Sequence, residues 1–157
     1  MQRIPMTPDG QRALTERLKY LKQVERTKNI EDISVARDKG DLSENAEYDA
    51  AKEKQQQISQ QIQDIEHKLS LAQVIDPKTI TFEKVAFGAT VTLNDLNNNE
   101  EVSYFIVGSD ESDISLKKIS IESPIARAMI GKKVGDEVIV TTPKGKREFE
   151  VVAIEYK

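Results

Sequence analysis

The sequence predicts an α+β protein in which a long antiparallel coiled-coil hairpin precedes a small β-sheet domain with one short helix. Apolar residues recur every three or four positions up to about residue 72, and β-branched residues interrupted by turn residues follow from Val74 onward. The composition agrees, because 32% of the 157 residues are charged and 38% hydrophobic, which suits a slender arm with a solvated outer surface. We therefore expect a hairpin over residues 1–76 and a C-terminal domain over residues 77–157.

The first helix is predicted to begin at Pro8, with Thr7 or Asp9 as its N-cap. Its seam starts with leucines at coiled-coil spacing, Leu14, Leu18 and Leu21. After Leu21 the strict seam positions become polar, and the apolar face passes to Val24, Ile30 and Ile33. We interpret this as a shift of the seam near Thr27, with less regular packing there.

The second helix has a more regular seam, in which one of seven positions is polar: Ala51, Gln55, Ile58, Ile62, Ile65, Leu69 and Ala72. Between the two helices, Gly40 suits a left-handed C-cap, and Asp41 suits the N-cap of the second helix. So short a connection makes the two helices antiparallel neighbours. The hairpin is thus expected to form within a monomer.

The C-terminal domain is predicted to hold five short strands, at residues 85–93, 101–107, 114–121, 137–142 and 149–155. Residues 97–99 and 143–146 are predicted turns, and the second of these joins an antiparallel hairpin. A short helix over residues 124–130 is expected to begin after Ser123 as N-cap and to end at Gly131. The result is a small, half-open antiparallel sheet covered by this helix.

Charge and residue usage exclude several classes of function. The formal charge of −4 is unfavourable for autonomous nucleic-acid binding, although a local basic patch is possible. The absence of cysteine excludes disulfides, Cys-ligated zinc and thiol catalysis, and the single histidine, His67, falls between seam positions and should be exposed and inert. No apolar run resembles a signal peptide or a membrane span, so we expect a soluble, cytoplasmic protein without membrane contact.

The predicted hairpin tip, residues 37–48, is the densest polar cluster of the chain, and it allows two interpretations. In the first, Asp41 and Glu44 form a capping box that satisfies the first amides of the second helix. In the second, the same two carboxylates, three residues apart on one helix face, hold a divalent cation such as Mg²⁺. Because Mg²⁺ takes about six oxygen ligands, two carboxylates on a solvated tip would make an incomplete site. Another molecule would have to supply the remaining ligands.

The stretch ARDKGDLSENAEYDAAKE at residues 36–53 resembles the tip of GreA-type bacterial transcript cleavage factors. MQRIPMT at the start, FGATVTL at 87–93 and SPIARAMIGKKVGDEV at 123–138 are also similar to that family. The resemblance implies an FKBP-like C-terminal domain and RNA polymerase as the partner. It further implies that the coiled coil enters the secondary channel of the polymerase, while the C-terminal domain docks at the rim of that channel.

The resemblance also implies roles for residues at the tip. Asp41 and Glu44 match the acidic pair that helps to hold a Mg²⁺ shared with the polymerase and to activate the attacking water, when the RNA 3′ end of a backtracked complex is extruded. The chain would then not be an enzyme by itself, and it would stimulate cleavage by the polymerase. Arg37 and Lys52 flank the tip as a small basic patch toward the RNA.

Three further tip residues have less specific expectations. Ser43 could orient the water or the RNA, or could be an ordinary residue of the helix turn. Asn45 and Tyr48 lie where they could touch RNA or the polymerase, although packing across the hairpin is the favoured role of Tyr48. In the C-terminal domain, Ser123, Pro124 and Arg127 match a segment near the polymerase contact. The competing interpretation of that segment is a helix cap with core packing by Ile125, Met129 and Ile130.

Three functions are compatible with these patterns. The first is transcript cleavage by way of the acidic tip, and the second is a regulator of the same shape that binds the channel without cleavage. The third is a coiled-coil chaperone or prolyl isomerase, which the architecture alone suggests. The presence of both Asp41 and Glu44 favours the first.

Overall fold

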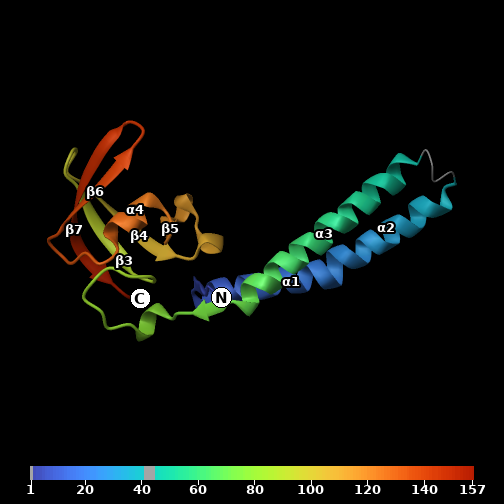
Figure 1. Ribbon diagram of the computed structural model, residues 1–157, viewed down its shortest axis with the longest axis horizontal. Coiled ribbons are helices and arrows are strands. Elements are labelled where there is room, and N and C mark those ends of the chain that lie inside the picture. The colour runs from blue at the N-terminus through green and yellow to red at the C-terminus, as the bar shows by residue number, and fades with distance from the viewer. Residues whose placement is uncertain (1, 41–44) are drawn as a thin grey trace. The chain divides into compact units, whose positions relative to one another are not determined.

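The computed structural model describes residues 2–40 and 45–157 and confirms the α+β class (Figure 1). The chain divides into two compact units. One comprises Gln11–Ala72 and forms the helical hairpin, and the other comprises Arg3–Gly10 with Gln73–Lys157 and contains the large sheet. Among the described residues, no helix is both long and apolar enough to cross a lipid bilayer.

The first arm of the hairpin is one continuous helical path built from α1 (Pro8–Tyr20), a π-helical segment (Leu21–Glu25) and α2 (Arg26–Asp38). Tyr20 and Arg26 keep right-handed helical dihedral angles, so the π segment widens the helix without breaking it. A π-helical turn accommodates an extra residue. The predicted shift of the seam is therefore present, and it begins at Leu21 rather than near Thr27.

The seam after this shift differs from the predicted one. Val24 and Ile30, expected on the apolar face, are about half exposed, whereas Asn29 is buried and continues the seam to Ile33 and Ala36. The extra residue in the π turn rotates the following helix, so positions four residues apart from Leu21 onward now face the second arm. Periodicity counted without that turn was therefore wrong for Val24 and Ile30.

The second arm is α3 (Ala46–Ser70), which runs beside α1 and α2 along the hairpin (Figure 1). Its residues Ile58, Ile62 and Ile65 are buried with Leu21 in one apolar cluster, against which Leu14, Leu18 and Leu69 pack. This confirms the central part of the predicted seam. Ala72 lies outside the helix, because α3 ends at Ser70 and Ala72 begins the strand β2 (Ala72–Val74).

Residues Arg3–Gly10 belong to the sheet unit, although the sequence assigned all of residues 1–76 to the hairpin. The strand β1 (Ile4–Met6) pairs with β2 in a two-stranded sheet. Thr7 caps α1, as predicted, because its hydroxyl accepts the Gly10 N–H at 3.1 Å. Glu111 accepts the Thr7 N–H at 3.0 Å, the Gly108 N–H at 3.2 Å and the Thr7 hydroxyl, which ties this segment to the sheet unit. Sequence periodicity gives no sign of such a long-range bond.

The large sheet has five strands in the order β5-β4-β3-β7-β6. The strands are β3 (Thr90–Asp95), β4 (Glu100–Val107), β5 (Lys118–Ser120), β6 (Glu137–Thr142) and β7 (Gly145–Glu155). All neighbours are antiparallel except β4 and β5, which are parallel, so the purely antiparallel prediction was wrong at this edge. The predicted strand at 114–121 shortens to β5, because Ile114–Leu116 forms a 3₁₀ turn with both apolar side chains exposed.

The core of this unit lies on one face of the sheet, beneath α4 (Pro124–Met129). Twelve buried residues form it, among them Leu93, Ile106 and Met129, each with no exposed surface. The predicted strand at 85–93 begins only at Thr90, but Val85 and Ala89 still point into the core from the preceding loop. Ile130, expected in the core, is 39% exposed because α4 ends at Met129 and the chain turns away.

Candidate functional site

The described part of the hairpin tip begins where α2 ends at Asp38. The Lys39 N–H donates to the Ala36 carbonyl at 3.3 Å, and the Gly40 N–H donates to the Arg37 carbonyl at 3.5 Å. Gly40 has a φ of +122°, which glycine adopts without steric cost. The expected glycine stop at the end of the first arm is therefore present.

The second arm begins at Ala46, and its N-cap is Asn45. Asn45 has extended backbone dihedral angles, and its Oδ1 accepts the Tyr48 N–H at 3.0 Å. The prediction that Asp41 caps this helix was therefore wrong, because the first free amides are satisfied four residues later. Asp41, Ser43 and Glu44 themselves lie outside the described residues.

The Asn45 side chain also links the two arms. Its Nδ2 donates to the Ala36 carbonyl of α2 at 2.5 Å, while its Oδ1 caps α3. The side chain is half-buried, and one donor and one acceptor of the amide are used within the hairpin. One side chain therefore links the end of α2 to the start of α3.

The basic residues predicted at the tip are at the surface. Arg37 is exposed, and Lys52 is exposed with its Nζ donating to the Gln55 Oε1 at 2.9 Å. Lys39 forms an ion pair of 3.0 Å with Glu47 across the tip, and both side chains are more than half exposed. An exposed pair contributes roughly 0.2–1 kcal/mol, so this pair adds little to the stability of the tip. Tyr48 is half-buried.

One residue near the tip was not predicted to have a role. Asn29 is 2% exposed, and its Nδ2 donates to the Ala51 carbonyl of the opposite arm at 2.9 Å. It borders a shallow hollow of about 470 Å³ between α2 and α3, near Lys39 and Glu47. The available signal was an asparagine four residues before Ile33, because a single buried asparagine in a coiled-coil seam often fixes register.

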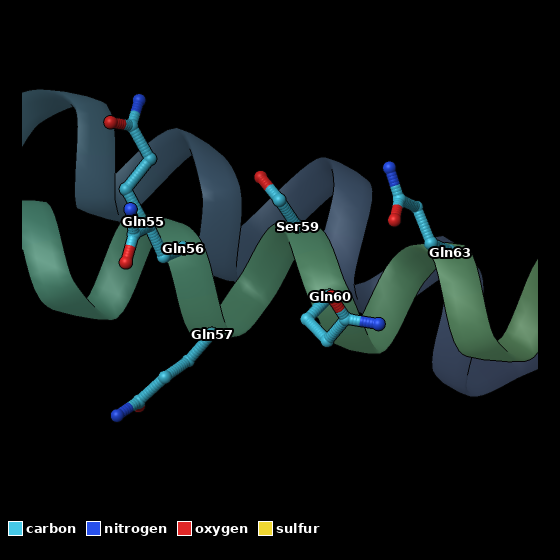
Figure 2. A pocket seen from close by; sticks show the side chains of 6 residues that line it. All are labelled: Gln55, Gln56, Gln57, Ser59, Gln60 and Gln63. Atoms are coloured by element: carbon cyan, nitrogen blue, oxygen red, sulfur yellow. The ribbon is translucent and has the colours of Figure 1, made fainter.

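Farther from the tip, α3 carries a surface of uncharged polar side chains, five amides and one hydroxyl (Figure 2). Its members border a hollow of about 590 Å³: Gln55, Gln56, Gln57, Ser59, Gln60 and Gln63. Gln55 and Gln57 point to opposite sides of the helix, so the side chains do not converge on one ligand position (Figure 2). This surface adds no cation to Arg37 and Lys52.

The C-terminal residues singled out by the sequence sit at the start of α4. The Ser123 hydroxyl accepts the Ala126 N–H at 3.3 Å and donates to the Ser120 carbonyl at 2.7 Å, which makes it the predicted N-cap. Pro124 occupies the first turn and Arg127 the second, and both are exposed. Ile125 is half-buried and Met129 fully buried against the core. One short helix thus packs against the sheet while presenting Pro124 and Arg127 to solvent.

Two carboxylates of the sheet unit have perturbed acidity. The backbone N–H of Asn97, 2.9 Å from the Asp95 carboxylate, lowers the pKa of Asp95, and the ion pair with Arg147 lowers it further against the opposing effect of burial. The Ser115 hydroxyl, 2.6 Å from Asp113, lowers the pKa of that carboxyl group. Both carboxylates organise turns, which accounts for their hydrogen bonds without a catalytic role.

Metal ligands were predicted only at Asp41 and Glu44. Within residues 2–40 and 45–157, no three acidic or histidine side chains lie close enough together to hold a metal ion. The donor type at the two predicted positions suits Mg²⁺, which prefers carboxylate oxygens.

Both halves of the chain match models of known families. Residues 4–74 match a model described as transcription elongation factor, N-terminal, and residues 80–156 match one described as transcription elongation factor, GreA/GreB, C-term. The transcription elongation factor GreA of Francisella tularensis subsp. novicida is 54% identical over 156 residues, covering 99% of this chain and 98% of that protein. GreA of Rickettsia felis is 53% identical over 155 residues, covering 99% and 96%. The crystal structure of GreA factor homolog 1 of Thermus thermophilus is 28% identical, covers 98% and 99%, and has a TM-score of 0.45.

Proposed function

Because the chain belongs to the GreA/GreB family of transcription elongation factors, we propose that its hairpin tip supplies acidic groups for cleavage of the nascent RNA 3′ end in backtracked, arrested complexes. The chain is a GreA-type elongation factor that acts with RNA polymerase and stimulates the polymerase's own transcript cleavage. Its site of action is the bacterial cytoplasm, where transcription takes place. Cleavage leaves a new 3′-OH from which elongation resumes.

The hairpin is proposed to reach the active centre through the secondary channel of the polymerase. The 25 residues of α3 correspond to a rod of about 37 Å at about 1.5 Å per residue. Two such helices side by side form a narrow arm, and only a narrow arm can carry side chains into a recessed site. This shape supports entry of the tip while the C-terminal domain stays outside.

The observation that carries the catalytic proposal is the capping of α3 by Asn45. A capping box would have explained Asp41 and Glu44 without any function, but this helix is capped elsewhere. In the proposal, Asp41 and Glu44 bind Mg²⁺ together with carboxylates of the polymerase, and they orient the attacking water. When bound, Mg²⁺ lowers the pKa of its water and stabilises charge on the phosphate oxygens.

The remaining tip residues are proposed to act on the RNA. The exposed cations Arg37 and Lys52 neutralise phosphates of the extruded strand. Ser43 lies between the two acidic residues and would hydrogen-bond the water or the RNA, and Tyr48 would face the RNA or the polymerase. In the C-terminal domain, exposed Pro124 and Arg127, held by the Ser123 cap, are proposed to contact the rim of the channel.

The test replaces each carboxylate with an amide of the same size, which removes the negative charge and keeps the shape of the side chain. Asp41→Asn and Glu44→Gln should each lower the maximal rate of RNA cleavage by roughly a hundredfold or more, since oriented catalytic groups contribute about that much. Stalled elongation complexes with labelled RNA and Mg²⁺ give the rate, and titration with the factor gives the affinity for polymerase. Both variants should bind polymerase like the unchanged protein.

Three outcomes would contradict the proposal. Undiminished cleavage by both variants would remove the catalytic role of the tip. Binding to stalled polymerase without any cleavage by the unchanged protein would instead identify a channel-binding regulator. Cleavage of free RNA without polymerase would mean that the chain is itself a nuclease.

A further inference from the structure

Two asparagines in the hairpin make the same kind of bond in opposite directions. Asn29 of the first arm donates to the Ala51 carbonyl of the second, and Asn45 at the start of the second arm donates to the Ala36 carbonyl of the first. The midpoint of each pair along the chain lies within one residue of Gly40. Both bonds therefore specify a single antiparallel register.

The apolar seam is weak where these bonds occur. The cluster that joins the two arms consists of Leu21, Ile58, Ile62 and Ile65, which lie away from the tip. Nearer the tip, the buried apolar side chains of the described residues are Ile33 and Ala36. Sliding one helix by a turn, about 5.4 Å, would separate both asparagines from their carbonyls. Leaving the buried amide of Asn29 without a partner would be unfavourable, so the two bonds oppose such a slip.

We propose that Asn45 is a positioning residue for transcript cleavage, which fixes the base of the tip segment that carries Asp41 and Glu44. This inference rests on the proposed function. Its side chain holds the Ala36 carbonyl at one end of residues 37–44 and the Tyr48 N–H just beyond the other end. The Ala36 carbonyl also accepts the Lys39 N–H, so the same contact organises the end of α2.

Helix capping by itself does not require asparagine at this position. Serine and aspartate cap helices about as well as asparagine. Neither can reproduce the second bond, because a carboxylate has no hydrogen to donate to the Ala36 carbonyl and a serine hydroxyl is one atom shorter. Asparagine satisfies both arms at once, which separates the positioning role from the capping role.

The test compares Asn45→Ser with Asn45→Asp in stalled elongation complexes. Both variants should lower the maximal cleavage rate by about tenfold or more, since a 1 Å misplacement can cost about a hundredfold. Both should raise the Mg²⁺ concentration for half-maximal cleavage, because the carboxylates are less well placed. The factor concentration for half-maximal binding to polymerase should stay within about twofold, since the capped helix is retained.

Asn29→Ser is the matched control. It removes the other cross-arm bond, at a site away from the cap, so it should lower the melting temperature of the hairpin without changing the Mg²⁺ requirement. A weaker binding constant with an unchanged maximal rate for the Asn45 variants would assign Asn45 to direct contact and overturn the proposal. A lower cleavage rate in Asn45→Asp alone would attribute the effect to the added negative charge. Wild-type cleavage by both variants would mean that Asn45 acts only as a helix cap.

Amide hydrogen exchange of the free protein tests the same bond without polymerase. In Asn45→Ser, the Lys39 amide should exchange faster while amides in the middle of α3 keep their protection. Unchanged exchange at Lys39 would overturn the positioning role. If the unchanged protein stimulates no cleavage at all, the proposed function fails, and the exchange measurement still decides whether Asn45 holds the base of the tip.

Discussion

The hairpin and the sheet unit are held together by different means. The sheet unit buries twelve residues in one core, whereas the cluster at the centre of the hairpin buries four. Toward its tip the hairpin relies on Asn29 and Asn45, whose bonds to the opposite arm are directional. Apolar burial supplies most of the free energy of folding but tolerates small displacements. Hydrogen bonds contribute less and require a defined geometry.

This difference suits a division of labour between the two units. Under the proposed function the sheet unit docks on the polymerase and needs stability, which its deep core supplies. The tip, which is proposed to be catalytic, needs accurate placement, and a narrow hairpin has no room for a core that could provide it. The hairpin therefore depends on polar contacts where the sheet unit depends on apolar ones.

The largest predicted effect compares one core residue from each unit. Leu93→Ala, at a fully buried position of the central strand β3, should lower the free energy of unfolding of the sheet unit by about 3–5 kcal/mol. Ile62→Ala in α3 should lower that of the hairpin by only about 2 kcal/mol, because a two-helix seam can collapse onto the smaller side chain. Native-state amide exchange measures each unit separately. Equal losses of unfolding free energy would show that the two units do not differ in how much their cores contribute.

An intermediate effect is expected at the attachment of the N-terminal segment to the sheet unit. A Cβ on Gly10 would clash with the carboxylate of Glu111, so Gly10→Ala must displace the carboxylate that holds Thr7. The loss of these charged hydrogen bonds should lower the stability of the sheet unit by about 1.5–3 kcal/mol. Denaturant unfolding followed by circular dichroism gives the value.

A double-mutant cycle separates the clash from other effects of alanine. In the Glu111→Ala background the carboxylate is absent, so adding Gly10→Ala should cost much less than it does alone. Additive losses would show that Gly10 is required for another reason. The hairpin's amide protection serves as the internal control.

The smallest effects come from changes of pH, and the first is a loss of stability of the sheet unit at low pH. The pKa of Asp95 is lowered in the folded protein by the Asn97 N–H and by Arg147, so its contribution to stability is present above the unfolded pKa of about 3.9 and is lost as the pH falls through the folded value. Asp113, with its pKa lowered chiefly by the Ser115 hydroxyl, has the same sign. The Asn29 and Asn45 bonds carry no titrating group. Amide exchange at pH 7 and pH 3 should therefore show a loss in the sheet unit that Asp95→Asn reduces.

High pH also lowers the stability of the sheet unit, through a group whose pKa is raised instead of lowered. Burial raises the pKa of Tyr156, whose hydroxyl donates to the Lys84 carbonyl at 2.6 Å. Its contribution is complete below the unfolded pKa of about 10 and is lost as the pH rises through the folded value. Tyr156→Phe should remove this alkaline loss, and an unchanged profile would contradict the assignment.

Local patterns in the sequence predicted the elements well where the physics is local. The Thr7 cap, the Gly40 stop and the Ser123 cap each depend on residues within four positions, and the structure has all three. The isoleucine seam of α3 was also predicted correctly, because the helical period is a local property of the sequence. Val24 and Ile30 were misassigned because one π-helical turn changes the phase of everything after it.

Only part of the candidate site could be predicted from the sequence. The acidic pair Asp41 and Glu44 stood out by type and spacing, and it remains a prediction because both residues lie outside the described part of the chain. Asn45 was predicted at the tip, but its bond to the first arm could not be inferred, since the acceptor is a carbonyl nine residues earlier in the chain. Asn29 was missed although its seam spacing to Ile33 was a usable signal, because the seam was counted without the π-helical turn.

By itself, the sequence determined the two long helices, most strands of the large sheet, the glycine stop at Gly40, and which family the chain resembles. Those features follow from periodicity and from residues that interact with near neighbours. Tertiary structure alone decided how the arms are held in register, that the Asn45 side chain also bonds the opposite arm, and that residues 3–10 belong to the sheet unit. These depend on contacts between residues up to 104 positions apart, which no local pattern encodes.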